Sequence, residues 1–162
     1  MLDSAAPLFQ VRQILEPRPG HQFAFLFDRL MDEAEMHRYC PSARFLITAI
    51  AKRHTLSFAP AGPTMIRQPG SIVYGALFEL PELELPALDQ HLEVGCRRDR
   101  RSMYVTASDG RLAAALFFPL RPQCLGLIDP VTVLRVAGIG RRLGFPSTYL
   151  SNVRAAIGET LH

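Results

Sequence analysis

Two apolar segments, Met103 to Ser108 and Arg111 to Phe118, flank the dipeptide Asp109-Gly110. An Asp-Gly pair in this setting is typical of a tight β-hairpin, because glycine accepts a positive φ angle at little steric cost. The sequence therefore predicts a hairpin with a type I′ turn over these residues. A β-sheet is the first element of the expected fold.

Further strands are indicated by runs of β-branched and aromatic residues. The segment from His21 to Phe27 (HQFAFLF) is mostly apolar on both faces, as expected of a buried central strand. Three more strands are predicted, at residues 43–51, 54–59 and 71–80. Pro60 to Gly70 is punctuated by proline and glycine, and is therefore predicted to be a loop.

Four helices are predicted between and after these strands, from the spacing of apolar residues and from residues typical of helix ends. They begin near Asp32, Pro86, Asp129 and Pro146. The first is short and ends near Tyr39. Gly144 is expected to end the third, since glycine suits the position after a helix.

The length of 162 residues, of which 48% are hydrophobic, suits one globular domain with a sizeable core. Residues 1–20 end in Glu-Pro-Arg-Pro-Gly, which breaks regular structure. We therefore expect an N-terminal arm at residues 1–20 and the domain at residues 21–162. Three scattered cysteines argue against a disulfide framework and for a reducing compartment. Neither a secretory signal nor a membrane span is recognisable, so we expect a cytoplasmic protein without membrane contact.

The formal net charge of +3 is too small by itself to indicate nucleic acid binding. Four arginines nevertheless stand within five positions, at Arg97, Arg98, Arg100 and Arg101. Such a run can bind a phosphate, a carboxylate-rich ligand, a nucleic acid backbone or a partner protein, or it can form a solvated loop. Because no aromatic residues alternate with the arginines to stack on bases, nucleic acid is the least favoured partner.

Neither a metal nor a cofactor is predicted. The five histidines include no pair four residues apart, and no cysteine stands near them at the spacing of metal ligands. The motifs of serine hydrolases and of phosphate-binding loops are absent from the sequence. Cys40 stands beside Pro41 in an apolar setting, and is interpreted as a small buried residue.

Four segments occur in a recognisable order. Residues 38–46 are RYCPSARFL, residues 69–80 are PGSIVYGALFEL, Leu88-Asp89 follows, and Gly144-Phe145-Pro146 precedes Tyr149. In this order they resemble the gamma-glutamylcyclotransferase-like family over roughly residues 21–158. The matching family features are a Cys-Pro segment with an arginine-bearing strand, a Pro-Gly-x-x-Val-x-Gly-x-Leu-Tyr-Glu-Leu strand, a Leu-Asp before the catalytic loop, and a C-terminal Gly-Leu-Pro-x-x-Tyr.

The resemblance implies an α+β fold, a small barrel-like mixed β-sheet with inserted and C-terminal helices and a pocket at one end. Family members cyclise a γ-glutamyl amide: the substrate's α-amine attacks its γ-carbonyl, which forms 5-oxoproline and releases an amine. The reaction needs a base, because an α-ammonium has no lone pair, and backbone N–H donors around the carbonyl oxygen. The expected partner is therefore a small molecule with a γ-glutamyl or other carboxylate group.

The chain departs from the family at the loop after the first strand. Phe27, Asp28, Arg29 and Leu30 stand where the family has Tyr-Gly-Ser-Asn, the loop that supplies the N–H donors. Asp28 adds a negative charge where the substrate's own carboxylate is expected, whereas Arg29 can recruit a carboxylate. Alternatively, both belong to a solvated turn. The candidate substrate-binding residues are Phe27, Asp28, Arg29, Leu30, Tyr104 and Tyr149.

The second departure concerns the catalytic glutamate. The family places it three residues after the aspartate of Leu-Asp, a position that Leu92 occupies here. Glu93 follows directly, so a one-residue insertion in the loop would return a carboxylate to the site. Glu93 is the candidate base, and the alternative is that it caps or solvates the end of the helix.

Three functions remain open at the level of sequence. The chain is an amide-cleaving cyclotransferase of altered substrate that uses Glu93, or a catalytically inactive module that binds a ligand or partner, or a structural subunit that makes contacts through its arginine run and arm. The first predicts that Glu93 points into a pocket beside residues 27–30. The second predicts Leu92 at the catalytic position and a pocket blocked by Phe25, Phe27 or Asp28.

Overall fold

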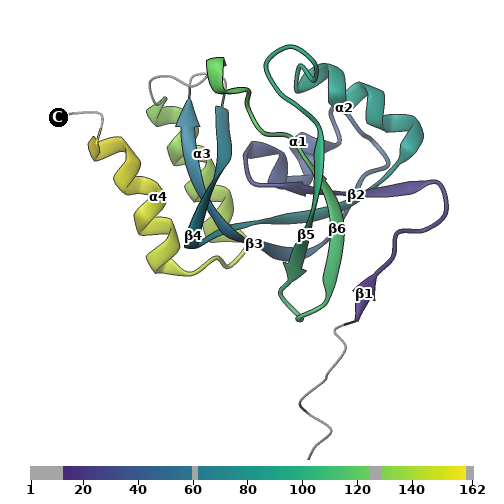
Figure 1. The fold of residues 1–162 in the computed structure, drawn as a ribbon, viewed down its shortest axis with the longest axis horizontal. Coiled ribbons are helices and arrows are strands. Elements are labelled where there is room, and N and C mark those ends of the chain that lie inside the picture. The colour runs from purple at the N-terminus through teal and green to yellow at the C-terminus, as the bar shows by residue number, and fades with distance from the viewer. Residues whose placement is uncertain (1–12, 60–61, 125–128, 160–162) are drawn as a thin grey trace, which may run out of the picture.

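The computed structural model describes residues 13–59, 62–124 and 129–159. Over these residues, six strands form one sheet in the order β1-β6-β2-β4-β3-β5. The strands β5 and β6 also pair with each other, which closes β2, β4, β3, β5 and β6 into a barrel (Figure 1). The pairing of β2 with β6 is parallel and the other pairings within the barrel are antiparallel. The predicted α+β fold with a barrel-like mixed sheet is thus confirmed.

The strands β3 (Arg44–Ala59) and β4 (Gly62–Pro81) form a long antiparallel ribbon. The predictions of two separate strands before residue 60 and of a loop up to Gly70 are therefore wrong. Arg67 pairs with His54 and Ile72 with Lys52, so residues 68–71 of β4 lie opposite Arg53 alone. Proline and glycine at positions 69 and 70 are tolerated there because no ladder hydrogen bond is required.

The hairpin predicted around Asp109-Gly110 is confirmed, with β5 at Arg101–Ala107 and β6 at Leu112–Phe117. Its turn is not of type I′, which would need a positive φ at two successive residues. Gly110 has a φ of +92°, whereas Asp109 does not have a positive φ. The Gly110 N–H donates to the Ala107 carbonyl at 2.8 Å, and the Ala107 N–H donates to Arg111. This is a three-residue turn with a glycine bulge.

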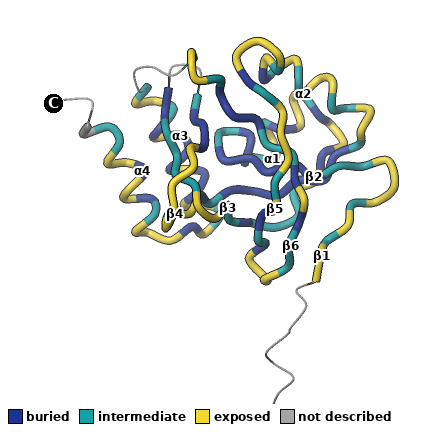
Figure 2. The backbone as a smooth tube through the Cα atoms, in the orientation of Figure 1, coloured by how far each residue is buried: buried dark blue, intermediate teal, exposed yellow. Residues whose placement is uncertain are grey.

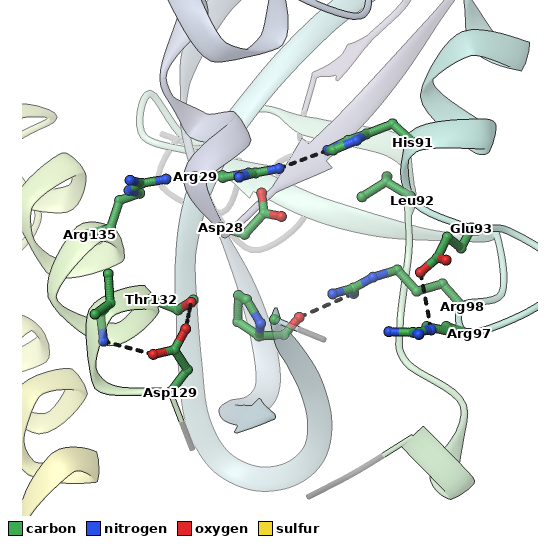
Figure 3. Close-up of a pocket in the computed structure, with 13 residues that line it drawn as sticks. Asp28, Arg29, His91, Leu92, Glu93, Arg97, Arg98, Asp129, Thr132 and Arg135 are labelled. Carbon is green, nitrogen blue, oxygen red and sulfur yellow. Dashed lines mark hydrogen bonds and ion pairs between the residues drawn. The ribbon is translucent and has the colours of Figure 1, made fainter. Parts of the chain in front are cut away.

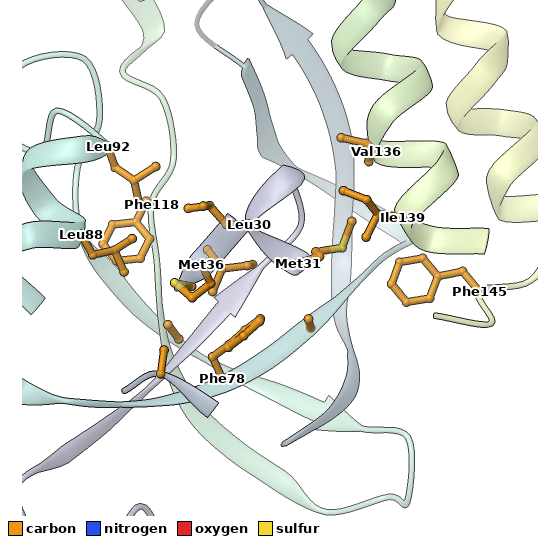
Figure 4. Packing of buried hydrophobic residues seen from close by; sticks show 14 of the residues in the cluster. Leu30, Met31, Met36, Phe78, Leu88, Leu92, Phe118, Val136, Ile139 and Phe145 are labelled. Carbon is orange, nitrogen blue, oxygen red and sulfur yellow. The ribbon is translucent and has the colours of Figure 1, made fainter. Parts of the chain in front are cut away.

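The strand β2 (His21–Leu26) is buried on both faces, as predicted. Alternate side chains, beginning with Phe23 and Phe25, fill the interior of the barrel together with small and β-branched residues of the other strands. The opposite face of the sheet packs against the helices through a second cluster that includes Leu30, Phe78 and Val136 (Figure 4). Figure 2 marks the buried stretches of the backbone in dark blue. The barrel therefore has an inner core and an outer core.

Within the described residues, four helices cover the outer core: α1 (Glu33–Met36), α2 (Leu85–His91), α3 (Pro130–Arg142) and α4 (Ser147–Glu159). Short 3₁₀ turns at Arg29–Met31, Glu82–Glu84 and Pro122–Cys124 connect them to the sheet. The predicted caps are present: the side chain of Asp32 accepts from the Ala34 N–H and that of Asp129 from the Val131 N–H. The first helix is shorter than predicted, because it ends at Met36.

Cys40 is fully buried, as predicted, and burial raises the pKa of its thiol to about 11, with the nearby charges of Glu84 and Asp89 acting in the same direction. It is therefore a packing residue and not a nucleophile at neutral pH. The described helices include none that is both long and apolar enough to cross a membrane.

The segment before β2 is joined to the barrel rather than separate from it. The strand β1 (Ile14–Leu15) pairs in parallel with β6. Arg18 donates from its backbone N–H and its Nε to the carboxylate of Glu79, at 3.1 and 2.7 Å. The Glu79 side chain is only 3% exposed and also receives a hydrogen bond from Arg44 at 3.3 Å. Of the predicted arm, residues 1–12 lie outside the described residues.

Candidate functional site

A cavity of about 400 Å³ opens at one end of the barrel. Four segments far apart in the sequence enclose it: the turn after β2, the loop between α2 and β5, the end of the β3–β4 ribbon and the first turns of α3 (Figure 3). Most of its lining side chains are charged or polar. The lining residues are Asp28, Arg29, Gly62, Pro63, His91, Leu92, Glu93, Arg97, Arg98, Asp129, Val131, Thr132 and Arg135.

The turn after β2 brings two of its four candidate residues to the cavity. Asp28 and Arg29 line it, whereas Phe27 and Leu30 are buried in the inner and outer core, respectively. The Asp28 carboxylate accepts the Leu30 N–H at 2.9 Å and so caps the 3₁₀ turn. In this chain an N–H of the loop is therefore bonded to a side chain of the same loop.

The end of α2 places both Leu92 and Glu93 on the cavity wall. Leu92 is 8% exposed and ends the helix. Glu93 has a φ of +56°, a left-handed conformation that turns its side chain away from the helix axis. Its carboxylate forms an ion pair with Arg97 Nε at 3.3 Å and is about half exposed. The structure thus gives the cavity an apolar and an acidic side chain at successive positions.

His91 is a cavity residue that the sequence analysis did not select. Its ring stacks on Tyr39 with centroids 3.6 Å apart, and its Nε2 lies 3.3 Å from Arg29 Nη2. Burial lowers the pKa of His91 below its ordinary value, and the positive charge of Arg29 lowers it further. The imidazole is therefore neutral at pH 7 and accepts a hydrogen bond from Arg29. The only signal in the sequence was its place one residue before Leu92.

The arginine run does not form one solvated surface. Arg98 is 5% exposed, and its Nη1 donates to the carbonyl oxygens of Pro63 at 3.2 Å and Phe118 at 2.7 Å. It thereby ties the α2–β5 loop to the ribbon and to the segment after β6. Arg97, Arg100 and Arg101 are exposed and form ion pairs with Glu93, Asp89 and Asp99, respectively. Arg97 and Arg98 line the cavity.

The first turns of α3 supply a wall that the sequence analysis predicted as a helix but not as part of a site. Asp129 accepts from the Val131 N–H at 3.1 Å and from the Thr132 hydroxyl at 2.9 Å. One turn later, Arg135 also lines the cavity. Helical periodicity identified α3, but nothing in one sequence indicates which end of a barrel a helix reaches.

Tyr104 and Tyr149 are not brought to this cavity. Tyr104 lies on β5 and is 61% exposed. Tyr149 lines a different cavity of about 340 Å³ between α4 and the ribbon, and burial raises the pKa of its hydroxyl well above the ordinary range. Their roles in substrate binding stay predictions. Among residues 13–59, 62–124 and 129–159, no group of three or more histidine, cysteine or acidic side chains is placed so that it could hold a metal ion.

The arginine side chains determine which kind of ligand the cavity can bind. Its three acidic residues are engaged within the protein: Asp28 with Leu30, Glu93 with Arg97, and Asp129 with the start of α3. Arg29 and Arg135, by contrast, make no ion pair with a carboxylate among residues 13–59, 62–124 and 129–159. Two guanidinium groups that face a cavity without a carboxylate partner are suited to an anionic ligand.

Comparison with known protein families gives a match to the model described as "Gamma-glutamyl cyclotransferase, AIG2-like" over residues 24–130. The matched region spans β2, the β3–β4 ribbon, α2, the β5–β6 hairpin and the first residue of α3. It includes all of the cavity-lining residues before α3. A comparison with curated proteins found no match.

Solved structures with the same fold include one titled gamma-glutamyl cyclotransferase, with a TM-score of 0.71 and 17% identity over 83% of this chain and 87% of that chain. An uncharacterized protein from Homo sapiens gives a TM-score of 0.72 and 17% identity, over 84% and 88%. A yeast gamma-glutamyl cyclotransferase specific to glutathione gives a TM-score of 0.59 and 8% identity, over 87% and 97%. At these identities the likeness shows the shared fold.

Proposed function

Since the chain belongs to the gamma-glutamyl cyclotransferase, AIG2-like family, we propose that its cavity binds a small molecule that carries a carboxylate, of the γ-glutamyl type. The observation that carries this proposal is that Arg29 and Arg135 line the cavity and have no carboxylate partner in the described part of the chain. A guanidinium binds a carboxylate through two parallel hydrogen bonds, which gives both affinity and orientation.

The arrangement favours binding over the family's cyclisation chemistry. Leu92, which the sequence resemblance aligns with the family's glutamate when the loop has no insertion, has no group that can accept a proton. The Leu30 N–H already donates to Asp28, so it is not available to a substrate carbonyl oxygen in this conformation. An oxyanion donor is worth about 10²–10³ in rate, and a general base about 10²–10⁴. A ligand can therefore be held here without being turned over.

Calorimetric titration with glutarate tests the binding proposal. The wild type is expected to bind, and Arg135→Gln to bind about tenfold more weakly, because one charge-assisted contact is lost. Arg141→Gln is the matched control, since Arg141 is exposed on the same helix but does not line the cavity. Absence of binding by the wild type, or equal affinities of the wild type and Arg135→Gln, would contradict the proposal.

A second candidate is an active cyclotransferase, and one observation favours it: the Glu93 carboxylate lines the same cavity. In that mechanism Glu93 takes a proton from the substrate α-ammonium, the amine attacks the γ-carbonyl, and the proton passes to the leaving amine. The Glu93 carboxylate must first leave its ion pair with Arg97, because one of its oxygens has to reach the substrate ammonium.

Release of 5-oxoproline from a panel of γ-glutamyl amides and peptides separates the two candidates. Loss of the release in Glu93→Gln would establish the enzyme and its base. Release that survives this substitution would keep the enzyme and remove Glu93 from the role. If no member of the panel gives 5-oxoproline while glutarate binds, the chain is a binding module.

A further inference from the structure

Arg29 reaches the cavity from a turn whose backbone is fixed. Leu30 and Met31, which follow it, are 0% and 1% exposed in the outer core, and the Asp28 carboxylate caps the turn through the Leu30 N–H. The side chain of Arg29, by contrast, has several rotatable bonds. The position of its guanidinium group therefore depends on contacts that the side chain itself makes.

The contact that the structure shows is with a histidine. Arg29 Nη2 lies 3.3 Å from His91 Nε2, and Arg29 lies between His91 and Arg135 on the cavity wall (Figure 3). Since a guanidinium group can only donate hydrogen bonds, Nε2 is the acceptor and the ring proton is on Nδ1. A neutral acceptor orients the guanidinium without cancelling its charge, whereas a carboxylate would do both.

The ring of His91 is held from two sides. His91 is the last residue of α2, so its backbone belongs to the helix. Its ring stacks on Tyr39, with centroids 3.6 Å apart and planes at 16°. Tyr39 in turn follows α1, and its N–H donates to the carbonyl of the buried Met36 at 3.0 Å. The stacked ring therefore presents Nε2 in one direction.

The surroundings of His91 keep its ring neutral. Burial lowers the pKa of His91 most, the positive charge of Arg29 lowers it further, and Arg38 acts in the same direction. The negative charges of Asp28 and Glu35 raise it, but the pKa stays below its ordinary value of 6.5. At pH 7 the Nε2 atom is therefore free of a proton and able to accept from Arg29.

We propose that His91 is a positioning residue for ligand binding: its neutral ring, stacked on Tyr39, directs the Arg29 guanidinium into the cavity and leaves its full charge to the ligand. This inference rests on the proposed function and adds to it a residue that acts through Arg29. Without this acceptor, the guanidinium is free to turn toward Asp28, its neighbour in the chain, and a ligand must order the side chain itself.

Two substitutions of His91 separate the acceptor from the ring. His91→Phe keeps a flat ring for Tyr39 but removes Nε2, and is expected to bind glutarate about tenfold more weakly than wild type in calorimetry. His91→Gln restores an acceptor, because its amide oxygen can take the place of Nε2. Its affinity should lie closer to that of wild type than to that of His91→Phe. His54→Phe, on the ribbon outside the cavity, is the matched control and should bind as wild type does.

A double-mutant cycle tests whether His91 acts through Arg29. In the Arg29→Gln background, His91→Phe should cause no further loss of affinity for glutarate, because the side chain that His91 positions is already gone. A general disturbance of the cavity would instead lower the affinity by the same factor in both backgrounds. Thermal melts of all variants check that they are folded.

Nitrogen NMR of the histidine rings tests the contact without any ligand. In the free wild type at pH 7.5, His91 should carry its proton on Nδ1. In Arg29→Gln, the pKa of His91 from an NMR titration should rise, since one of the positive charges that lower it is removed. A proton on Nε2, or a pKa that does not change, would refute the contact on which the role depends.

The outcomes also separate this inference from the proposed function. If the wild type does not bind glutarate, the proposed function and the role of His91 in it both fail. If the wild type binds glutarate and His91→Phe binds it equally well, the role of His91 alone is refuted. The role is likewise refuted if His91→Gln binds as weakly as His91→Phe, or if the loss caused by His91→Phe persists in the Arg29→Gln background.

Discussion

Glu79 is an acidic residue inside a hydrophobic barrel. It lies opposite Phe23 of β2 and Arg44 of β3, so its side chain shares the inner face with Phe23. Burial alone raises the pKa of Glu79, but hydrogen bonds from Arg18 and the charges of Arg18 and Arg44 outweigh it and hold the pKa below its ordinary value. The ionised form is therefore the one the folded protein stabilises.

Glu79→Gln is expected to lower the free energy of unfolding by about 2–4 kcal/mol at pH 7, because two arginines lose a buried partner. A carboxylate with a lowered pKa in the folded state contributes stability above its unfolded pKa, about 4.3, and loses it as the pH falls through the folded pKa. Urea denaturation at several pH values should show the difference between wild type and variant shrinking below about pH 4. A difference that is independent of pH would contradict the assigned role.

The sequence resemblance predicts that Asp28 and Leu92 stand where the family has a glycine and its catalytic glutamate. The double variant Asp28→Gly with Leu92→Glu supplies a carboxylate and frees the Leu30 N–H. We expect it to release 5-oxoproline from a γ-glutamyl amide at least about tenfold faster than wild type, with each single variant slower than the pair, since base and donors act together. A thermal melt serves as the control for folding. A double variant no faster than wild type would contradict this account of the two positions.

At the scale of the elements, α3 and α4 touch where Gly140 leaves no side chain. A Cβ at this position would lie 2.7 Å from Phe145 Cδ2 and 2.9 Å from Leu150 Cδ2. Both neighbours belong to the outer core, so neither can move without disturbing others. The contact between the two helices therefore depends on glycine.

Gly140→Ala should destabilise the protein by about 1–3 kcal/mol through overpacking, despite the better helix propensity of alanine. Gly138 offers a matched control in the same helix, because a Cβ there meets nothing within 4 Å. Gly138→Ala should stabilise by about 0.5–1 kcal/mol. Chemical denaturation of the two variants gives the comparison, and equal effects of the same sign would contradict it.

The elements show which parts of the fold local sequence can predict. The hairpin, β2 and the caps of α1 and α3 follow from short motifs, and all of them are present. The sequence predicts two strands before residue 60 and then a loop, because a Pro-Gly pair such as Pro69-Gly70 usually interrupts a strand. Here the bulge opposite Arg53 absorbs both residues, and that bulge is a property of the pairing with β3 rather than of either segment.

At the scale of the whole molecule, the segment before β2 is tied to the barrel at two places, the β1–β6 pairing and the contact of Arg18 with Glu79. Deletion of residues 1–19 should therefore destabilise the domain by more than Arg18→Ala does, because it also removes β1. Leaving a buried charge with fewer partners costs about 3–5 kcal/mol. Urea denaturation measures both variants.

Glu79→Gln in the shortened chain should recover part of this loss, since the charge that lacks a partner is removed. If the shortened chain is as stable as the full one, the boundary at residue 20 describes an independent domain after all.

The candidate site was predictable only in part. Asp28, Arg29, Leu92 and Glu93 were selected because the family resemblance marks their positions, and all four line the cavity. His91, Asp129 and Arg135 were not, because their place depends on the closure of the barrel and on the packing of α3. The burial of Arg98 within a run of exposed arginines likewise follows from two carbonyl oxygens of distant segments.

The closure of the barrel also has a consequence for folding. The ribbon and the hairpin join neighbours in the chain and can form early, whereas the pairing of β2 with β6 joins Ala24 to Leu116 and has a high contact order. The four segments around the cavity meet only once that late step is complete. A ligand therefore binds the native state alone and raises the midpoint of thermal unfolding in proportion to the logarithm of its concentration. A thermal-shift screen of small carboxylates is thus a direct route to the natural ligand.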